Sequence, residues 1–235
     1  MKKIKVICPV STDIWIELRK KNMNKWKDDY TSVDCINIEK GPESIECTYD
    51  EVWAELFTVQ EAEKAEREGY DGVIIHCFGD PGLRAAKEKL NIPIVGINES
   101  SIHIASILGN KFSIISPNPT LGMTNDKIKL YGFEHKCASI RSIRISVLDL
   151  EKDKNLVAER VFEEAKKAVD EDGADTIVYG CGAILGVEER ILKELKVPVV
   201  VPGFAGLKAL EALIFMRIAQ SKHYFRTPAE KKRIL

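Results

Sequence analysis

The sequence lacks the features that mark membrane and exported proteins. No apolar run reaches the roughly 18 residues that a membrane-spanning helix needs. The opening stretch, MKKIKVICPV, has too short an apolar segment for a signal peptide, and no small-residue cleavage site follows it. We therefore expect this stretch to be a first β-strand, and we predict a cytoplasmic protein with no membrane partner.

A surplus of charge of one sign is also missing. The 35 Lys and Arg residues nearly balance the 36 Asp and Glu residues, so the formal net charge is −1. The two signs are interspersed along the chain, which is typical of a solvated surface. Because no basic field is available to attract phosphates, we expect no nucleic-acid partner.

Motifs for metal binding and for disulfides are absent as well. The six cysteines are spread over 235 residues, with no C-x-x-C and no histidine pair at zinc-protease spacing. His76 adjoins Cys77, but neighbouring strand residues point to opposite faces and would chelate a metal poorly. We predict free thiols and no metal, with His76 packed or on the surface rather than acting as a base.

What the sequence does contain is an alternation of short apolar runs with helical patterns, which indicates an α/β fold with mainly parallel strands. Asp80 and Pro81 predict the N-cap and first residue of a helix in PGLRAAKEKL. A further helix is expected from about Gly206. The other expected strands are KIKVICPV, GVIIHC, IPIVGI, KFSIIS, GADTIVYGC and VPVVV, and the other expected helices are residues 50–68, ESSIHIASIL, residues 156–172 and GVEERILKEL.

The series of elements occurs twice. KIKVIC matches KFSIIS at an offset of 108, and Gly69, Asp71 and Cys77 match Gly173, Asp175 and Cys181 at an offset of 104. We therefore predict two similar lobes related by a pseudo-twofold axis, residues 1–109 with Cys77 and residues 110–235 with Cys181. In such doubled proteins the last helix can cross back onto the first lobe, and the tail HYFRTPAEKKRIL could form a strap or a frayed end. The two aspartates precede strands and are expected to fix loops.

Cys77 and Cys181 are the candidate catalytic residues. Each ends a predicted strand, and ligands of parallel α/β sheets bind beyond the carboxyl ends of strands. Two lobes that face each other would bring the two thiols to opposite sides of one cleft. Such a pair suits inversion of a stereocentre by proton transfer, with one thiolate as the base and one thiol as the acid. The alternative is that both are buried core thiols.

The segments GYDGVIIHCFGDPGLRAA, IPIVGINES and GADTIVYGCG together resemble the aspartate/glutamate/hydantoin racemase superfamily, and CFGDPGL resembles its hydantoin and allantoin racemase branch. The resemblance covers nearly the whole chain. It implies a two-lobed α/β fold and racemisation or epimerisation without a cofactor. The family's catalytic cysteines map onto Cys77 and Cys181. The residues implied to bind the substrate are Ser11, Thr12, Phe78, Gly79, Ser116 and Gly182.

One departure from the branch concerns the loop after the first strand. The branch carries an N-P-N-T-S-like loop, whereas this chain has CPVST, so Cys8 and Val10 replace two amide side chains. Recognition of the substrate ring is therefore expected to differ. Cys8 and Trp15, near this loop, are further candidates for the pocket wall.

We expect a small-molecule substrate, with five-membered hydantoins first and acidic amino acids second. Two other readings remain open: a maleate-isomerase-like or decarboxylase-like enzyme of the same superfamily, and a two-lobed binding protein without chemistry. On family grounds the chain could also form a homo-oligomer.

Overall fold

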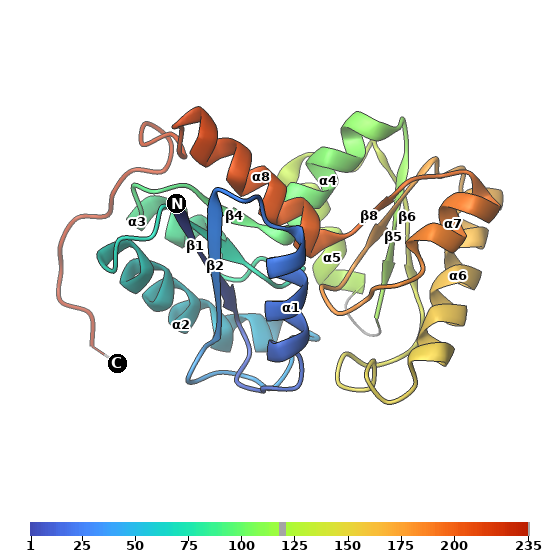
Figure 1. Cartoon of the computed structure of the whole chain (residues 1–235), viewed down its shortest axis with the longest axis horizontal. Helices are drawn as coiled ribbons and strands as arrows, with labels where there is room; N and C mark the ends of the chain where they lie inside the picture. The colour runs from blue at the N-terminus through green and yellow to red at the C-terminus, as the bar shows by residue number, and fades with distance from the viewer. Residues whose placement is uncertain (118–120, 235) are drawn as a thin grey trace.

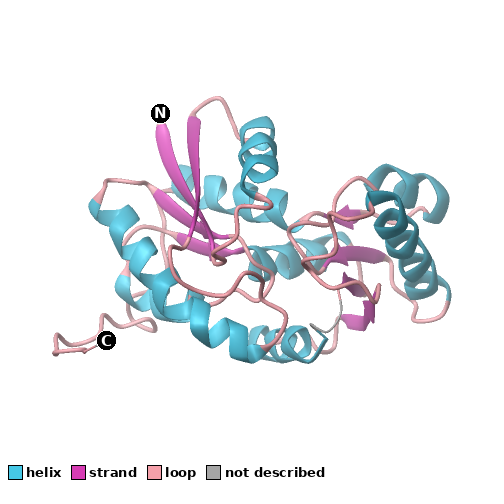
Figure 2. Ribbon diagram, turned by 90° about the horizontal axis from the view of Figure 1, so that it is seen from below, coloured by secondary structure: helices cyan, strands magenta, loops and turns pink. Residues whose placement is uncertain are grey.

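The computed structural model describes residues 1–117 and 121–234, and its strands form two four-stranded parallel sheets. The strand order is β2-β1-β3-β4 in the first sheet and β6-β5-β7-β8 in the second. Figures 1 and 2 show the two groups of strands in separate halves of the molecule. The strands are β1 Lys2–Cys8, β2 Thr31–Asn37, β3 Gly72–Ile75, β4 Ile94–Gly96, β5 Phe112–Ser116, β6 Cys137–Ser142, β7 Thr176–Tyr179 and β8 Val199–Val200.

Helices flank both sheets, which confirms the predicted α/β class. They are α1 Ile16–Trp26, α2 Thr48–Arg67, α3 Leu83–Lys89, α4 Ile97–Leu108, α5 Leu121–Tyr131, α6 Lys154–Asp170, α7 Glu188–Leu195 and α8 Pro202–Met216. Each strand and helix expected from the sequence is present, although α8 begins four residues before Gly206 with Pro202 in its first turn. The elements α1, β2, α5 and β6 were not predicted. They occupy equivalent places in the two halves.

The repeat extends to individual hydrogen bonds. Asp71 accepts a backbone hydrogen bond from Lys3 N (2.8 Å) in the first residues of β1, and Asp175 accepts one from Lys111 N (3.1 Å) directly before β5. Backbone bonds run in return from Asp71 N to Lys3 O and from Asp175 N to Lys111 O. Both aspartates therefore fix the loop before their own strand to the start of the central strand, as predicted.

Helices α4 and α8 are exchanged between the two halves. Ile102 and Ala105 of α4 pack in one core cluster with residues of β5, β7 and β8, whereas Leu207 and Leu210 of α8 pack with residues of β1, β3 and β4. The two helices contact each other at Gly206, where a Cβ would stand 2.9 Å from Ile97 Cγ2. Figure 1 shows them side by side between the sheets.

The prediction that Asp80 caps its own helix is wrong. Helix α3 begins at Leu83, after Gly82 in a left-handed conformation with φ of 74°. The Asp80 carboxylate instead accepts from the backbone N–H groups of Asn98 (3.1 Å) and Glu99 (2.8 Å), in the first turn of α4. The cap acts across 18 residues because the turn that follows Cys77 folds back onto α4.

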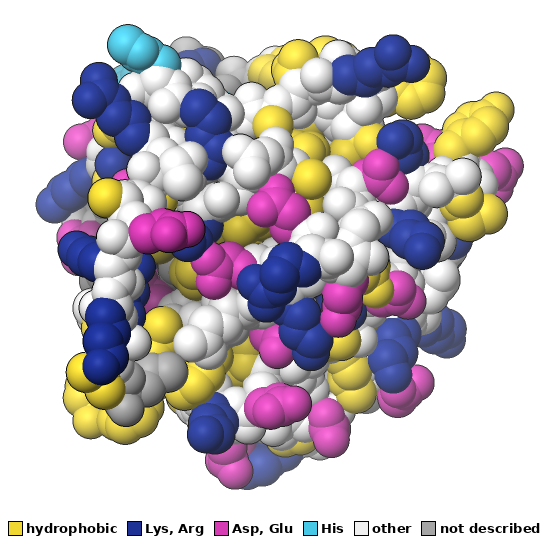
Figure 3. Space-filling model, turned by 90° about the vertical axis from the view of Figure 1, so that its left-hand side faces the viewer, with side chains coloured by type: hydrophobic (Ala, Val, Ile, Leu, Met, Phe, Trp, Pro, Cys, Tyr) yellow, Lys and Arg dark blue, Asp and Glu magenta, His cyan; other side chains and the backbone are white. Residues whose placement is uncertain are grey.

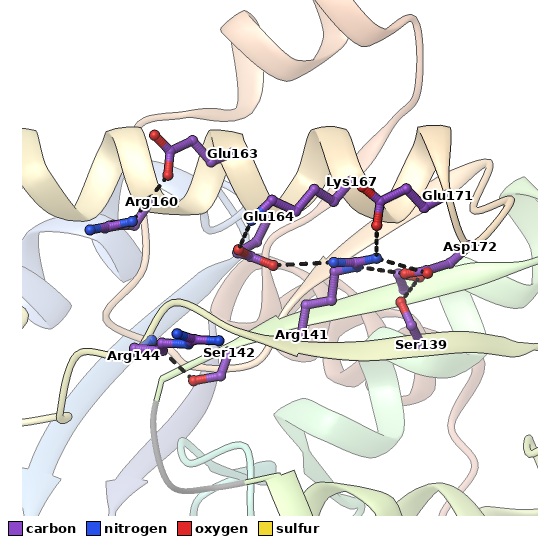
Figure 4. A network of polar contacts seen from close by, with 11 residues as sticks. Ser139, Arg141, Ser142, Arg144, Arg160, Glu163, Glu164, Lys167, Glu171 and Asp172 are labelled. Atoms are coloured by element: carbon purple, nitrogen blue, oxygen red, sulfur yellow. Dashed lines mark hydrogen bonds and ion pairs between the residues drawn. The ribbon is translucent and has the colours of Figure 1, made fainter.

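Helix α6 is tied to the edge strand β6 by one arginine (Figure 4). Arg141 pairs with Asp172 at 2.6 Å, with Glu171 at 2.8 Å and with Glu164 at 3.4 Å. Three carboxylates around one guanidinium fix the end of α6 to the sheet.

After α8 the chain runs along the first half of the molecule. Gln220 donates to the carbonyls of Leu90 and Ile92, and Lys222 to those of Lys87 and Glu88. Basic and acidic side chains are mixed on the face shown in Figure 3. None of the helices within the described ranges is long and apolar enough to cross a bilayer.

Candidate active site

Cys77 and Cys181 line one cavity between the two halves. The cavity encloses about 580 Å³ of space between atoms, part of it open to solvent. Its wall also includes residues of α1 and α5 and of the loops after β1, β2, β3, β6 and β7. They are Val10, Trp15, Arg19, Ile45, His76, Phe78, Gly79, Met123, Thr124, Val147, Gly180, Gly182 and Ala183.

The two cysteines are held by equivalent turns. The backbone N–H of Gly79 points at Cys77 Sγ (3.4 Å), and that of Ala183 points at Cys181 Sγ (3.5 Å). In each turn the cysteine carbonyl also accepts a hydrogen bond from the backbone N–H three residues later: Cys77 O from Asp80, and Cys181 O from Ile184. Each sulfur therefore has one backbone donor that would stabilise its thiolate form.

Burial raises the pKa of both thiols, although each keeps some contact with solvent. The surrounding charges differ between them. Cys181 itself, Glu51 and Asp80 raise the pKa of Cys77 further, whereas Arg19 opposes the rise at Cys181. Of the two sulfurs, Cys181 therefore has the more favourable surroundings for a thiolate. The sequence argument for a resting thiol and thiolate did not include this burial.

Three of the six residues expected to bind substrate lie on the cavity wall: Phe78, Gly79 and Gly182. The described lining contains neither Ser11 nor Thr12; the Ser11 hydroxyl donates to the carbonyls of Gly41 and Pro42 instead.

Ser116 is also absent from the described lining. It is buried at the end of β5, where a Cβ on Gly180 would stand 2.6 Å from its hydroxyl oxygen. It therefore lies behind the turn that carries Cys181.

His76 is packed, as predicted, and it forms part of the cavity wall. Arg19 Nε donates to His76 Nδ1 at 3.0 Å, so the ring is neutral with its proton on Nε2. Burial and the Arg19 charge lower the pKa of His76 well below its ordinary value. The ring is confined by glycines, because a Cβ on Gly182 would stand 2.4 Å from Cε1 and one on Gly203 would stand 2.6 Å from Nε2.

Sequence reasoning missed Arg19, the only cation lining the cavity among the described residues. It also missed the ion pair between Glu51 of α2 and Lys127 of α5, whose Oε1 and Nζ lie 3.0 Å apart. Glu51 packs against Gly79, where a Cβ would stand 2.7 Å from the same oxygen. This pair joins the two halves beside the turn of Cys77.

Asp80 joins the Cys77 turn to both neighbouring helices. Besides the first turn of α4, it accepts from the Tyr131 hydroxyl of α5 at 2.9 Å. Burial, reinforced by the Glu99 charge and opposed by the three donors, raises the pKa of Asp80 to about 7. Its own φ of 48° is one that L-residues rarely adopt, and the bonds to α4 and Tyr131 hold it there. Within the described ranges, no cluster of three or more His, Cys, Asp or Glu side chains is placed to hold a metal.

Comparison with protein families gives one match. The model of the family described as Asp/Glu/Hydantoin racemase matches residues 4–210. A hydantoin racemase of Pseudomonas sp. (strain NS671) is 37% identical over 203 residues, which cover 86% of this chain and 82% of that protein.

Solved structures agree with this match. An allantoin racemase from Klebsiella pneumoniae superposes with a TM-score of 0.93 at 33% identity and covers 98% of this chain and 95% of its own. A maleate isomerase from Pseudomonas putida S16 has a TM-score of 0.66 at 15% identity, covering 92% of this chain and 93% of its own. The second likeness is one of fold alone.

Proposed function

This chain belongs to the Asp/Glu/hydantoin racemase family, and on that premise we propose that Cys77 and Cys181 are the two proton carriers of its racemase reaction. The observation that carries the proposal is their equivalence. Both follow the inner strands of equivalent sheets, both line one cavity, and both receive a backbone N–H from the residue two positions on.

The proposed substrate is a 5-substituted hydantoin, whose C5 carries the stereocentre. The thiolate of one cysteine removes the C5 proton, and the electron pair that remains passes into the adjacent C4 carbonyl. The thiol of the other cysteine then delivers its proton to the opposite face of C5. The two sulfurs exchange protonation states, so the reaction can run in either direction.

Cys181 is the better candidate for the resting thiolate. Arg19 favours its ionised form, whereas the neighbours of Cys77 disfavour a charge there. The backbone amides of the turns that contain Phe78 and Gly182 are proposed to hold the ring oxygens, where negative charge develops. The three hydroxyl residues Ser11, Thr12 and Ser116 are off the described wall. Substrate contact through Ser11 or Thr12 would require the loop after β1 to move, and contact through Ser116 would require the end of β5 to move.

The test uses single Cys77→Ser and Cys181→Ser variants in heavy water, with each enantiomer of a 5-substituted hydantoin. Proton NMR measures exchange at C5, and optical rotation measures racemisation. Each variant should lose racemisation by at least about 100-fold, the lower end of the usual contribution of a general acid or base. Residual exchange should be confined to one enantiomer, and the two variants should retain opposite ones.

The matched control is Cys47→Ser, because Cys47 is exposed and is not among the described residues that line the cavity. It should racemise at the rate of the parent protein. Full racemisation by either active-site variant would refute the two-cysteine proposal. Exchange of the same enantiomer by both variants would show that one base serves both faces.

A further inference from the structure

Arg19 is a buried cation without a counter-ion. It lies on α1 with 9% of its surface exposed and takes part in no ion pair among the described residues. Its Nε donates to His76, but its Nη1 is buried and has no hydrogen-bond partner. A buried guanidinium is costly to leave uncompensated, so a site that keeps one in a substrate cavity points to an anion that joins it there.

The surrounding wall supplies no such anion. His76 is neutral, and burial raises the pKa of the neighbouring Cys8 thiol even though Arg19 opposes this. The wall residues Val10, Ile45 and Val147 on other elements are apolar and supply no charge. The charge of Glu46 raises the pKa of Cys181, but Glu46 forms no ion pair with Arg19. Its carboxylate accepts a hydrogen bond from the Ser44 hydroxyl instead.

Trp15, which directly precedes α1 and whose carbonyl accepts from Arg19 N at 3.0 Å, provides a second unused donor. It is 4% exposed, lines the same cavity, and its Nε1 is buried without a partner. Residues 15 and 19 are four apart, and side chains at that spacing lie next to each other on a helix. Two unused N–H donors, one of them charged, thus belong to a part of the cavity wall that residues 15–19 contribute, next to the cysteine turns.

We propose that Trp15 and Arg19 form a subsite for a carboxylate on the C5 substituent, so that the preferred substrates are hydantoins with an acidic side chain. This inference rests on the proposed function, since it takes the cysteine turns as the seat of the ring. A neutral side chain would leave the guanidinium desolvated and uncompensated. A carboxylate would accept from both donors and offset the charge.

The experiment compares two substrates that differ almost only in charge, 5-(carboxymethyl)hydantoin and 5-(carbamoylmethyl)hydantoin. The parent protein should show a kcat/KM about 10- to 100-fold higher for the carboxylate, the range expected for charge-assisted hydrogen bonding. Arg19→Gln should lose that advantage: its kcat/KM should fall about 10- to 100-fold more on the carboxylate than on the amide, with the excess loss mainly in KM. The loss shared by both substrates measures the effect of Arg19 on Cys181. Arg19→Lys should restore part of the advantage of the carboxylate, and Trp15→Phe, which keeps an aromatic ring, should lose a few-fold on the carboxylate alone.

Lys20→Gln is the matched control, because Lys20 is the next residue on α1, is exposed and pairs with Glu17. It should leave both substrates unchanged. Thermal melting verifies that each variant is folded, and the preference of the parent protein is a test that needs no variant.

Two kinetic results would overturn the subsite. One is a preference of the parent protein for the amide. The other is an equal loss of kcat/KM on both substrates in Arg19→Gln, which would mean that Arg19 stabilises the ionised ring or the Cys181 thiolate and not the C5 substituent.

Failure of the proposed function is distinguishable from failure of the subsite. If the parent protein racemises hydantoins and Arg19→Gln keeps the parent's preference for the carboxylate over the amide, the function stands and the subsite is wrong. If no hydantoin exchanges its C5 proton, the function is wrong. In that case a rise in melting temperature with succinate that is abolished in Arg19→Gln would still support the anion subsite, and its absence would overturn it.

Discussion

Adding one methyl group at Gly182 should destabilise the protein through His76. The new Cβ of Gly182→Ala would stand 2.4 Å from His76 Cε1 and 2.8 Å from Nδ1. Carbon atoms in contact are about 3.5–4.0 Å apart, so the imidazole would have to retreat by about 1 Å. It has little room, because Arg19 holds one nitrogen and the backbone at Gly203 lies against the other.

Overpacking of this kind costs about 1–3 kcal/mol of unfolding free energy. For a chain of this size each kcal/mol lowers the melting temperature by about 2–4 °C, so Gly182→Ala should melt about 2–12 °C below the parent protein. Differential scanning calorimetry measures the shift. Racemisation should fall as well, because the displaced ring narrows the cavity and moves Arg19.

The control is Gly122→Ala in α5, where a Cβ meets nothing within 4 Å. That change should be neutral or stabilise by about 0.5–1 kcal/mol, the usual gain for alanine in a helix. A double-mutant cycle with His76→Ala should give a coupling energy of about 0.5–3 kcal/mol between positions 76 and 182. A Gly182→Ala protein that melts with the parent, together with zero coupling, would refute the account of a confined ring.

Three further predictions concern stability measured by urea denaturation. The pKa of Asp80 is raised to about 7, so the folded state keeps a proton that the unfolded chain releases above about pH 4. The free energy of unfolding, measured relative to that of Asp80→Asn, should therefore decrease from about pH 4 to pH 7. A difference that stays constant over this range would contradict the prediction. Arg141→Met leaves three carboxylates facing one another and should lower the free energy of unfolding by about 1–3 kcal/mol, with a smaller loss in 1 M salt because screening increases. An equal loss at low and high salt concentration would argue against charge as the cause. Leu210→Ala empties a fully buried site between α8 and the first sheet and should cost about 2–5 kcal/mol; a loss below about 1 kcal/mol would mean that α8 is not part of the core.

The fold and the cysteine pair were predictable from the sequence because both leave a local and repeated signal. The strand that precedes Cys77 recurs before Cys181 with the same acid at the same spacing, and alternation of short apolar runs with helical patterns predicts parallel sheets. The role of Asp71 and Asp175 in fixing loops was also predictable, because each aspartate comes directly before an apolar strand. The elements α1 and α5 were missed because their charged residues and weak apolar periodicity give no comparable pattern.

Arg19 and the true role of Asp80 could not be inferred in the same way. Arg19 bonds a residue 57 positions away, and its neighbours in sequence, RKKN, look like any solvated helix face. Asp80 followed by Pro81 and Gly82 matches a capping pattern, but the turn uses a left-handed residue at position 80 and directs the carboxylate to another helix. In both cases the deciding partner is brought in by tertiary folding.

The exchange of α4 and α8 means that neither half of the chain contains its own complete core. A polypeptide cut between Gly109 and Asn110, the boundary that the repeat predicts, would carry α4 away from the sheet on which it packs and leave the first sheet without α8. Two copies of such a half-length chain could complete each other by lending their last helices, as in a domain-swapped dimer. The present protein has the arrangement of such a dimer joined head to tail, with each half contributing one cysteine, Cys77 or Cys181, to the cavity.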